Sequence, residues 1–153
     1  MTYEQLLIDA NSENLNVKEH LLIEHDGLIV GKRIAIRKDI DSSAEKSCIL
    51  AEELGHYYTS SGDILDQSKP ENRKQEHRAR LWAYNKMITI DKLANARKSG
   101  CRNRYEIAEY LDVTEEFLQE AIDSYKEIYG SGYHQYGDYL ICFDPLNIYM
   151  VTE

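Results

Sequence analysis

The stretch CILAEELGHYYTS, residues 48–60, is the most informative part of this sequence. On an α-helix, residues four positions apart lie on one face about one turn from each other, so Glu52 and His56 can share one cation. Glu53 is rotated from Glu52 by about 100°, which places its carboxylate beside the open position of such a metal. Gly55 weakens a helix interior by about 1 kcal/mol, and the close approach of another segment would explain its presence. The stretch therefore predicts either a metal-binding helix or an acidic surface helix.

A third ligand is available further along the chain. Residues 52–56 follow the H-E-x-x-H pattern of metal-binding helices, with Glu52 in the place of the first histidine. A catalytic zinc ion takes three protein ligands and keeps a fourth position open for water. Glu76 lies far enough beyond His56 for a loop and a returning helix to place it opposite. Arg80, one helical turn after Glu76, is a candidate to orient its carboxylate.

Two motifs together resemble those of the ImmA/IrrE family of metallopeptidases, which prophages and integrative elements often carry. The first is the stretch already quoted, where the family typically reads HELGH. The second is NRKQEHRARLWAY, residues 72–84, where the family has the form ExxAxxFA. Its positions are filled here by Glu76, Ala79, Trp82 and Ala83. The resemblance covers about residues 16–96 and, less securely, the tail.

The resemblance implies a gluzincin-like site in which Glu52, His56 and Glu76 hold Zn²⁺ and Glu53 is the catalytic base. The known substrates of the family are helix-turn-helix repressors, whose cleavage switches on a silenced element or a stress response. We therefore expect a zinc metalloendopeptidase that acts on a repressor of a prophage or mobile element. The alternative is a degenerate, non-catalytic protein that only binds the repressor.

Glu52 is the departure from the family pattern. A carboxylate in place of a neutral histidine lowers the formal charge of the metal site, so a bound metal would be a weaker Lewis acid. Oxygen ligands also widen the choice of metal toward Mn²⁺ or Fe²⁺. Zinc remains the prediction.

Three further residues are candidates for substrate contact. Tyr57 and Tyr58 directly follow His56, and either hydroxyl could donate to a developing oxyanion. Large aromatic residues beside such a motif more often serve packing. His134 lies in the tyrosine-rich segment SGYHQYGDY, where it could reach a substrate.

Composition excludes several classes of protein. A net charge of −9 over 153 residues disfavours direct nucleic-acid binding, which depends on Lys and Arg. No apolar run approaches the roughly 20 residues that a membrane span requires, and residues 1–14 do not resemble a secretory signal. Three widely spaced cysteines contain no CxxC pair, so we expect reduced thiols and a cytoplasmic location.

Periodicity predicts an α+β fold. We expect a small N-terminal antiparallel sheet packed on the metal-site helices, then a C-terminal helix pair resembling a helix-turn-helix, and a closing β-hairpin. The would-be recognition helix begins with Glu115 and Glu116, which would repel phosphates, so a packing role is favoured.

We expect residues 1–99 to form the metallopeptidase-like domain and residues 100–153 to pack with it as one compact unit. The spacing of Ser42 and Glu45 predicts a capped helix over 42–58, and Thr114 is the expected cap of the second helix of the pair. A helix over 71–89 should place Ala79, Ala83 and Met87 along one face. Further helices are predicted over 3–12, over 93–98 and on either side of 112–114. Asp26-Gly27 is a hairpin signal between strands predicted over 20–24 and 28–30. Further strands are predicted over 33–37 and in the tail from 139, and a loop through 60–70.

Overall fold

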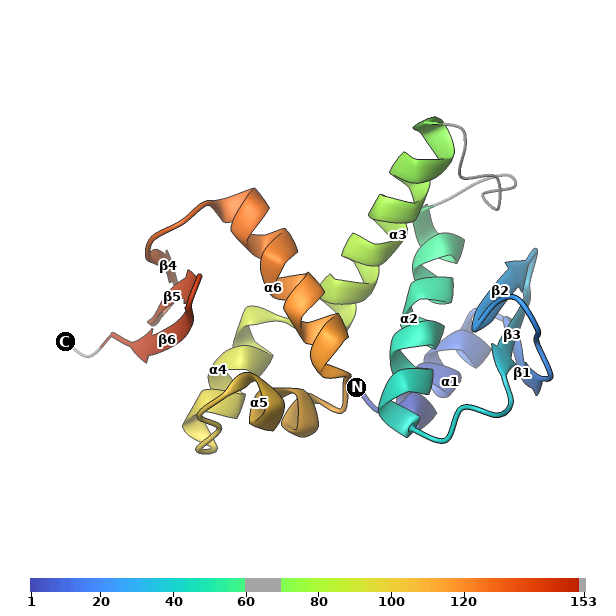
Figure 1. The fold of residues 1–153 in the computed structure, drawn as a ribbon, viewed down its shortest axis with the longest axis horizontal. Helices are drawn as coiled ribbons and strands as arrows, with labels where there is room; N and C mark the ends of the chain where they lie inside the picture. Colours follow the sequence, from blue (N-terminus) through green and yellow to red (C-terminus); the bar gives the residue numbers. More distant parts are fainter. Residues whose placement is uncertain (60–69, 152–153) are drawn as a thin grey trace. The chain divides into compact units, whose positions relative to one another are not determined.

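The computed structural model describes residues 1–59 and 70–151, which form the predicted α+β fold (Figure 1). These residues contain six helices and two separate three-stranded sheets. The chain divides into two compact units, Met1–Met87 and Ile88–Glu153. The first unit therefore ends before the boundary predicted at residue 99. The predicted loop through residues 60–70 falls almost entirely outside the described residues.

The first unit begins with helix α1, Tyr3–Ser12, as predicted. Thr2 caps it through a reciprocal pair of hydrogen bonds with Gln5. Three strands follow, and their order in the sheet is β1-β3-β2. Their bounds are Asn16–His20 for β1, Gly27–Val30 for β2 and Arg33–Arg37 for β3.

The pairing of these strands corrects the sequence prediction in one place. The strand predicted over residues 20–24 lies instead over Asn16–His20, and the Asp26-Gly27 pair leads into an edge strand rather than closing a hairpin. The hairpin is formed by β2 and β3 around Gly31, whose φ of 60° is readily adopted by glycine. This antiparallel pair was expected, but β1 runs parallel to β3, so the sheet is mixed. Parallel pairing sets Val17 beside the buried Ile34 of the central strand.

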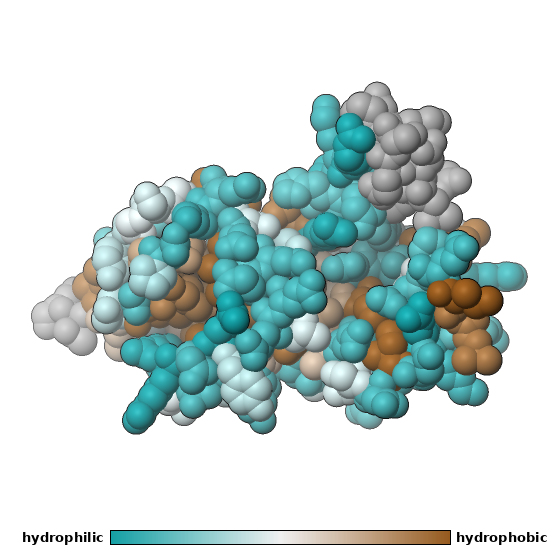
Figure 2. Space-filling model, in the orientation of Figure 1, coloured by the Kyte–Doolittle hydropathy of each residue, from teal (hydrophilic) through white to brown (hydrophobic). Residues whose placement is uncertain are grey.

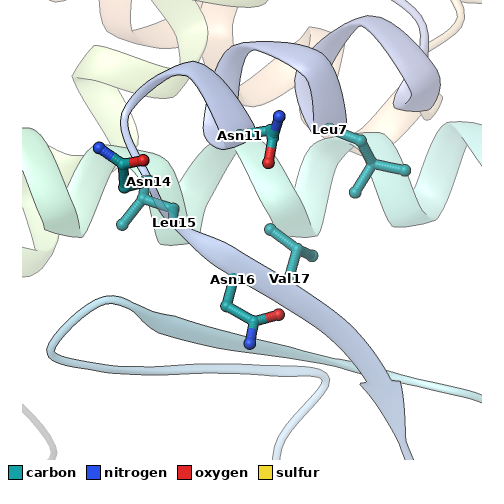
Figure 3. A pocket seen from close by; sticks show the side chains of 6 residues that line it. All are labelled: Leu7, Asn11, Asn14, Leu15, Asn16 and Val17. Atoms are coloured by element: carbon teal, nitrogen blue, oxygen red, sulfur yellow. The ribbon is translucent and has the colours of Figure 1, made fainter.

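A hollow of about 410 Å³ lies where α1 turns into β1 (Figure 3). Amide and aliphatic side chains line it, and none of them is titratable. The lining residues are Leu7, Asn11, Asn14, Leu15, Asn16 and Val17.

The two long helices of the first unit, α2 and α3, pack against each other more extensively than any other pair of described helices. Helix α2 covers Ser43–Thr59, and the predicted cap is present because the Ser42 hydroxyl accepts a hydrogen bond from the Glu45 amide at 3.2 Å. Helix α3 covers Pro70–Met87. Its predicted apolar face is fully buried and consists of Ala79, Ala83 and Met87.

The second unit contains the predicted helix pair and the closing hairpin. Thr114 caps the second helix of the pair by accepting a hydrogen bond from the Phe117 amide at 3.1 Å. The hairpin gains a short strand, β4, that sequence did not predict. The elements are α4, Ile90–Lys98; α5, Arg104–Leu111; α6, Glu115–Tyr129; β4, His134–Tyr136; β5, Tyr139–Phe143; and β6, Leu146–Met150.

Two predictions from composition also bear on the described residues. Cys48, Cys101 and Cys142 are all free thiols. No helix among the described residues is both long and apolar enough to cross a membrane.

Candidate active site

The backbones of α2 and α3 touch at Gly55. A Cβ atom built on Gly55 would lie 2.2 Å from the carbonyl oxygen of Ala79 and 2.9 Å from its carbonyl carbon. Only glycine permits this approach, because the atoms it meets belong to backbone that a rotamer change cannot move. The contact lies one residue before His56 on α2 and three residues after Glu76 on α3. It therefore sets the separation of those two side chains.

His56 and Glu76 meet across this helix contact. The His56 Nε2 atom lies 3.2 Å from Glu76 Oε2, and the two side chains are 8% and 22% exposed. Arg80 approaches the other oxygen of the same carboxylate, with its Nε atom 3.7 Å from Glu76 Oε1. The His56 Nδ1 atom is buried and has no hydrogen-bond partner within the described part of the chain. The imidazole thus directs its Nε2 atom at Glu76.

The electrostatics of this cluster are unusual for an acidic surface helix. Burial raises the pKa of Glu53 to about 7; His56 opposes this increase, whereas the charges of Glu52 and Glu76 add to it. Burial also opposes protonation of His56, but the hydrogen bond and charge of Glu76, with the charges of Glu53 and Glu52, outweigh it and raise the pKa of the imidazole. A carboxyl with a pKa near neutrality inside a polar cluster is a candidate general base.

Glu52 lies close enough for its charge to act on both Glu53 and His56. Among the residues that the structure describes, no group of three or more His, Cys, Asp or Glu side chains is arranged to hold a metal ion. The structure thus brings His56 and Glu76 into contact and places Glu53 beside them. The complete ligand set of Glu52, His56 and Glu76 stays a prediction.

The donor pair fits a divalent metal. Ligands about 2.0–2.1 Å from a tetrahedral zinc ion lie about 3.4 Å from each other. The Nε2–Oε2 distance of 3.2 Å between His56 and Glu76 is close to that separation. One imidazole and one carboxylate also match the nitrogen and oxygen donors that zinc accepts.

The aromatic candidates have packing partners. Tyr58 stacks on Trp82 of α3 with ring centroids 4.9 Å apart and an interplanar angle of 19°. Tyr57 contacts Tyr58 edge-on at 5.0 Å. His134 belongs to the second unit, where its Nε2 atom lies 3.3 Å from the Gly130 carbonyl oxygen. These contacts show that Tyr58 takes part in the packing of α2 on α3. Substrate contact by Tyr57, Tyr58 and His134 stays a prediction.

Gly27 is a site residue that the sequence did not reveal. A Cβ atom at this position would lie 2.6 Å from Ile49 Cγ2 and 2.9 Å from Glu53 Oε1. The start of β2 therefore passes directly over α2 beside the Glu53 carboxyl. The Asp26-Gly27 pair was interpreted as a turn, and no local pattern distinguishes such a turn from a close strand–helix contact.

Comparison with known families identifies the family of the protein. The match is to the IrrE N-terminal-like domain, Peptidase_M78, and covers residues 5–123. The protein belongs to this family, as its motifs predicted. Membership indicates a metal-dependent peptidase in general terms, with a divalent metal that is generally zinc. No curated protein and no solved structure matches the chain significantly.

Proposed function

We propose that this protein is a zinc-dependent endopeptidase that cleaves a helix-turn-helix repressor of a prophage or mobile element. The observation that carries the proposal is the contact of His56 with Glu76 beside a half-buried glutamate, Glu53, whose pKa is raised to about 7. Family membership supports the peptidase class. The repressor as substrate rests on the resemblance of the two motifs to the ImmA/IrrE family.

Three side chains of the two helices are the proposed metal ligands. Glu52, His56 and Glu76 would hold it, and Arg80 would keep the Glu76 carboxylate oriented. Zinc, when bound, supplies Lewis acidity toward the oxygen of a peptide carbonyl.

Glu53 transfers the proton from the attacking water to the leaving amine. A carboxylate with a pKa near 7 can accept a proton from water at neutral pH as the water oxygen attacks the carbonyl carbon. When the C–N bond breaks, the same carboxyl returns the proton to the departing amine nitrogen. The water is thereby divided between the new carboxyl group and the new amine, and Glu53 ends in its starting state.

Strand β2 offers a place for an extended substrate. It lies at the edge of the sheet, so among the described strands it is paired on one side only, with β3. An extended peptide can add to such an edge through backbone hydrogen bonds. Because Gly27 brings this strand beside Glu53, a peptide bound there would pass the base.

Cleavage of purified repressors tests the proposal. The zinc-loaded protein is incubated with the helix-turn-helix repressors encoded in the same genome, and mass spectrometry identifies any new termini. Wild type should cleave one of them, and Glu53→Gln should abolish cleavage while it retains zinc. Glu109→Gln, an exposed glutamate of α5, is the matched control and should cleave normally. If wild type binds a repressor and leaves it intact, the protein is instead a non-catalytic anti-repressor, as the substitution at Glu52 would suggest.

A further inference from the structure

Within the described residues, the N-terminal sheet has one face covered by helices and one face that no helix covers. Ile34 and Ile36 of the central strand are buried on the side where α1 and α2 pack. The alternate residues of the three strands form the opposite face, because side chains alternate along a strand. Cross-strand pairing places Lys18 beside Ala35 and Ala35 beside Leu28. The next row sets Arg33 beside Val30.

This open face contains a hollow of about 650 Å³. Its apolar lining side chains lie on β2 and on the central strand β3, and its basic and imidazole side chains lie on β1 and β3. Its lining includes Lys18, His20, Leu28, Val30, Arg33 and Ala35. We call this set the open sheet face.

The charge of the open sheet face is opposite to that of the whole protein. The chain has a net charge of −9, yet the lining of the hollow contains lysine and arginine and no acid. Neither Lys18 nor Arg33 forms an ion pair within the part of the chain that the structure describes. Both cations are therefore available to carboxylates from outside.

The margin of the sheet also exposes apolar side chains. The three most exposed large hydrophobic residues of the described chain are Ile23, at 93%, Leu21, at 79%, and Val30, at 68%. All three belong to β2 or to the connection that leads to it. Arg37 holds this connection in place by donating to the Ile23 carbonyl oxygen at 3.2 Å and pairing with Asp26 at 3.1 Å. Brown side chains accordingly gather over strands β1–β3 at the right of Figure 2. Exposed apolar groups beside charged ones typify protein-interaction surfaces.

We propose that the open sheet face docks the protein substrate through a segment that combines carboxylates with branched apolar side chains. The apolar side chains would enter the hollow over Leu28 and Val30, while the carboxylates pair with Lys18 and Arg33. That the docked protein is the substrate rests on the proposed function. The binding of carboxylates and apolar side chains to the open sheet face does not depend on it.

The position of β2 would allow this docking to select the protein substrate. Leu28 and Val30 point to the open face, and Gly27, on the alternate face, lies against Glu53. A protein held on the open face is thus attached to the strand that borders the base. Such docking raises the local concentration of the substrate, so it lowers KM and leaves kcat unchanged.

Fluorescence anisotropy with labelled peptides tests the docking without any cleavage step. The probe alternates glutamate with valine and leucine; one control peptide has lysine for glutamate, and another has serine for the apolar residues. Metal-free protein should bind the probe at least about tenfold more tightly than either control. Arg33→Glu should weaken binding of the probe about tenfold, and Val30→Ser several-fold. Lys98→Glu makes the same charge change at an exposed site of the second unit and should change binding by less than about twofold.

Several results would overturn the proposal. Equal weakening by Arg33→Glu and Lys98→Glu would show that only net charge matters, and equal binding of the lysine peptide would contradict charge pairing. A wild-type dimer that Arg33→Glu converts to a monomer would show that a second copy occupies the face. With a cleaved repressor, Arg33→Glu should raise KM about tenfold and leave both kcat and hydrolysis of a short peptide unchanged. If the probe binds as expected but no repressor is cleaved, the proposed function fails and the docking surface stands.

Discussion

Replacing Glu53 by glutamine should make the metal-free protein more stable at alkaline pH. Burial, opposed by His56 and reinforced by the charges of Glu52 and Glu76, raises the pKa of Glu53 from 4.5 to about 7. The folded protein therefore holds this proton more tightly than the unfolded chain does. The corresponding stability is fully present below about pH 4.5 and is lost as the pH rises through about 7.

The size of the effect follows from the two pKa values. Their difference corresponds to about 3 kcal/mol of unfolding free energy, which is an upper limit because the site can relax when the carboxylate forms. His56 acts in the same direction, because its raised pKa gives stability that is present below 6.5 and lost as the pH rises through the folded value. Glu53→Gln removes the contribution of the carboxyl, so a smaller pH dependence from His56 should remain.

Urea denaturation in the presence of a chelator measures this effect. At pH 8 the Glu53→Gln protein should exceed wild type by about 2–3 kcal/mol, whereas at pH 4.5 the two should be nearly equal. Glu109→Gln, an exposed position, should follow wild type at both pH values. Parallel stability profiles for wild type and Glu53→Gln would refute the reasoning, because they would mean that the carboxyl is not desolvated in the folded protein.

Three other changes test separate parts of the structure. Gly55→Ala should destabilise the first unit by about 2 kcal/mol and reduce zinc affinity, because a Cβ atom 2.2 Å from the Ala79 carbonyl oxygen would force α2 and α3 apart. Calorimetry and zinc titration measure these effects, and unchanged stability would contradict the close contact. Glu52→His should raise the affinity for zinc relative to manganese and shift the acid limb of the pH–activity profile about one pH unit toward acid. An unchanged profile in an active enzyme would mean that Glu52 is not a ligand. Tyr125→Phe should lower the free energy of unfolding by about 1–2 kcal/mol, because the buried Tyr125 hydroxyl donates a hydrogen bond to the Ile88 carbonyl oxygen at 2.7 Å. An unchanged free energy in urea denaturation would exclude a stabilising role for this hydrogen bond.

The elements that sequence predicted well are those whose signals are local. The helix that contains Glu53 was located from its Ser42 cap, and it extends over Ser43–Thr59. Thr114 likewise marked the start of α6. Capping and helical periodicity depend on residues within a few positions of each other, so a single sequence contains the information.

The first sheet shows where local signals fail. Asp26-Gly27 has the composition of a hairpin turn, but the hairpin forms at Gly31 and β1 pairs with β3 in parallel. Strand pairing depends on which partner buries the apolar residues of both strands, and this is decided between segments distant in sequence. The position of Gly27 against Glu53 is a consequence of that pairing, which is why the sequence did not reveal it.

The sequence by itself determined the chemistry that is available: an acidic helix with Glu52, Glu53 and His56 in fixed angular relation, and a second helix with Glu76. Tertiary structure alone decided that His56 and Glu76 lie 3.2 Å apart and that Glu53 is desolvated enough to have a pKa near 7. The physical reason is that helix geometry fixes the angles between neighbouring side chains. The distance between two helices, and the water that they exclude, depend instead on how closely their backbones approach, here at Gly55 and Ala79.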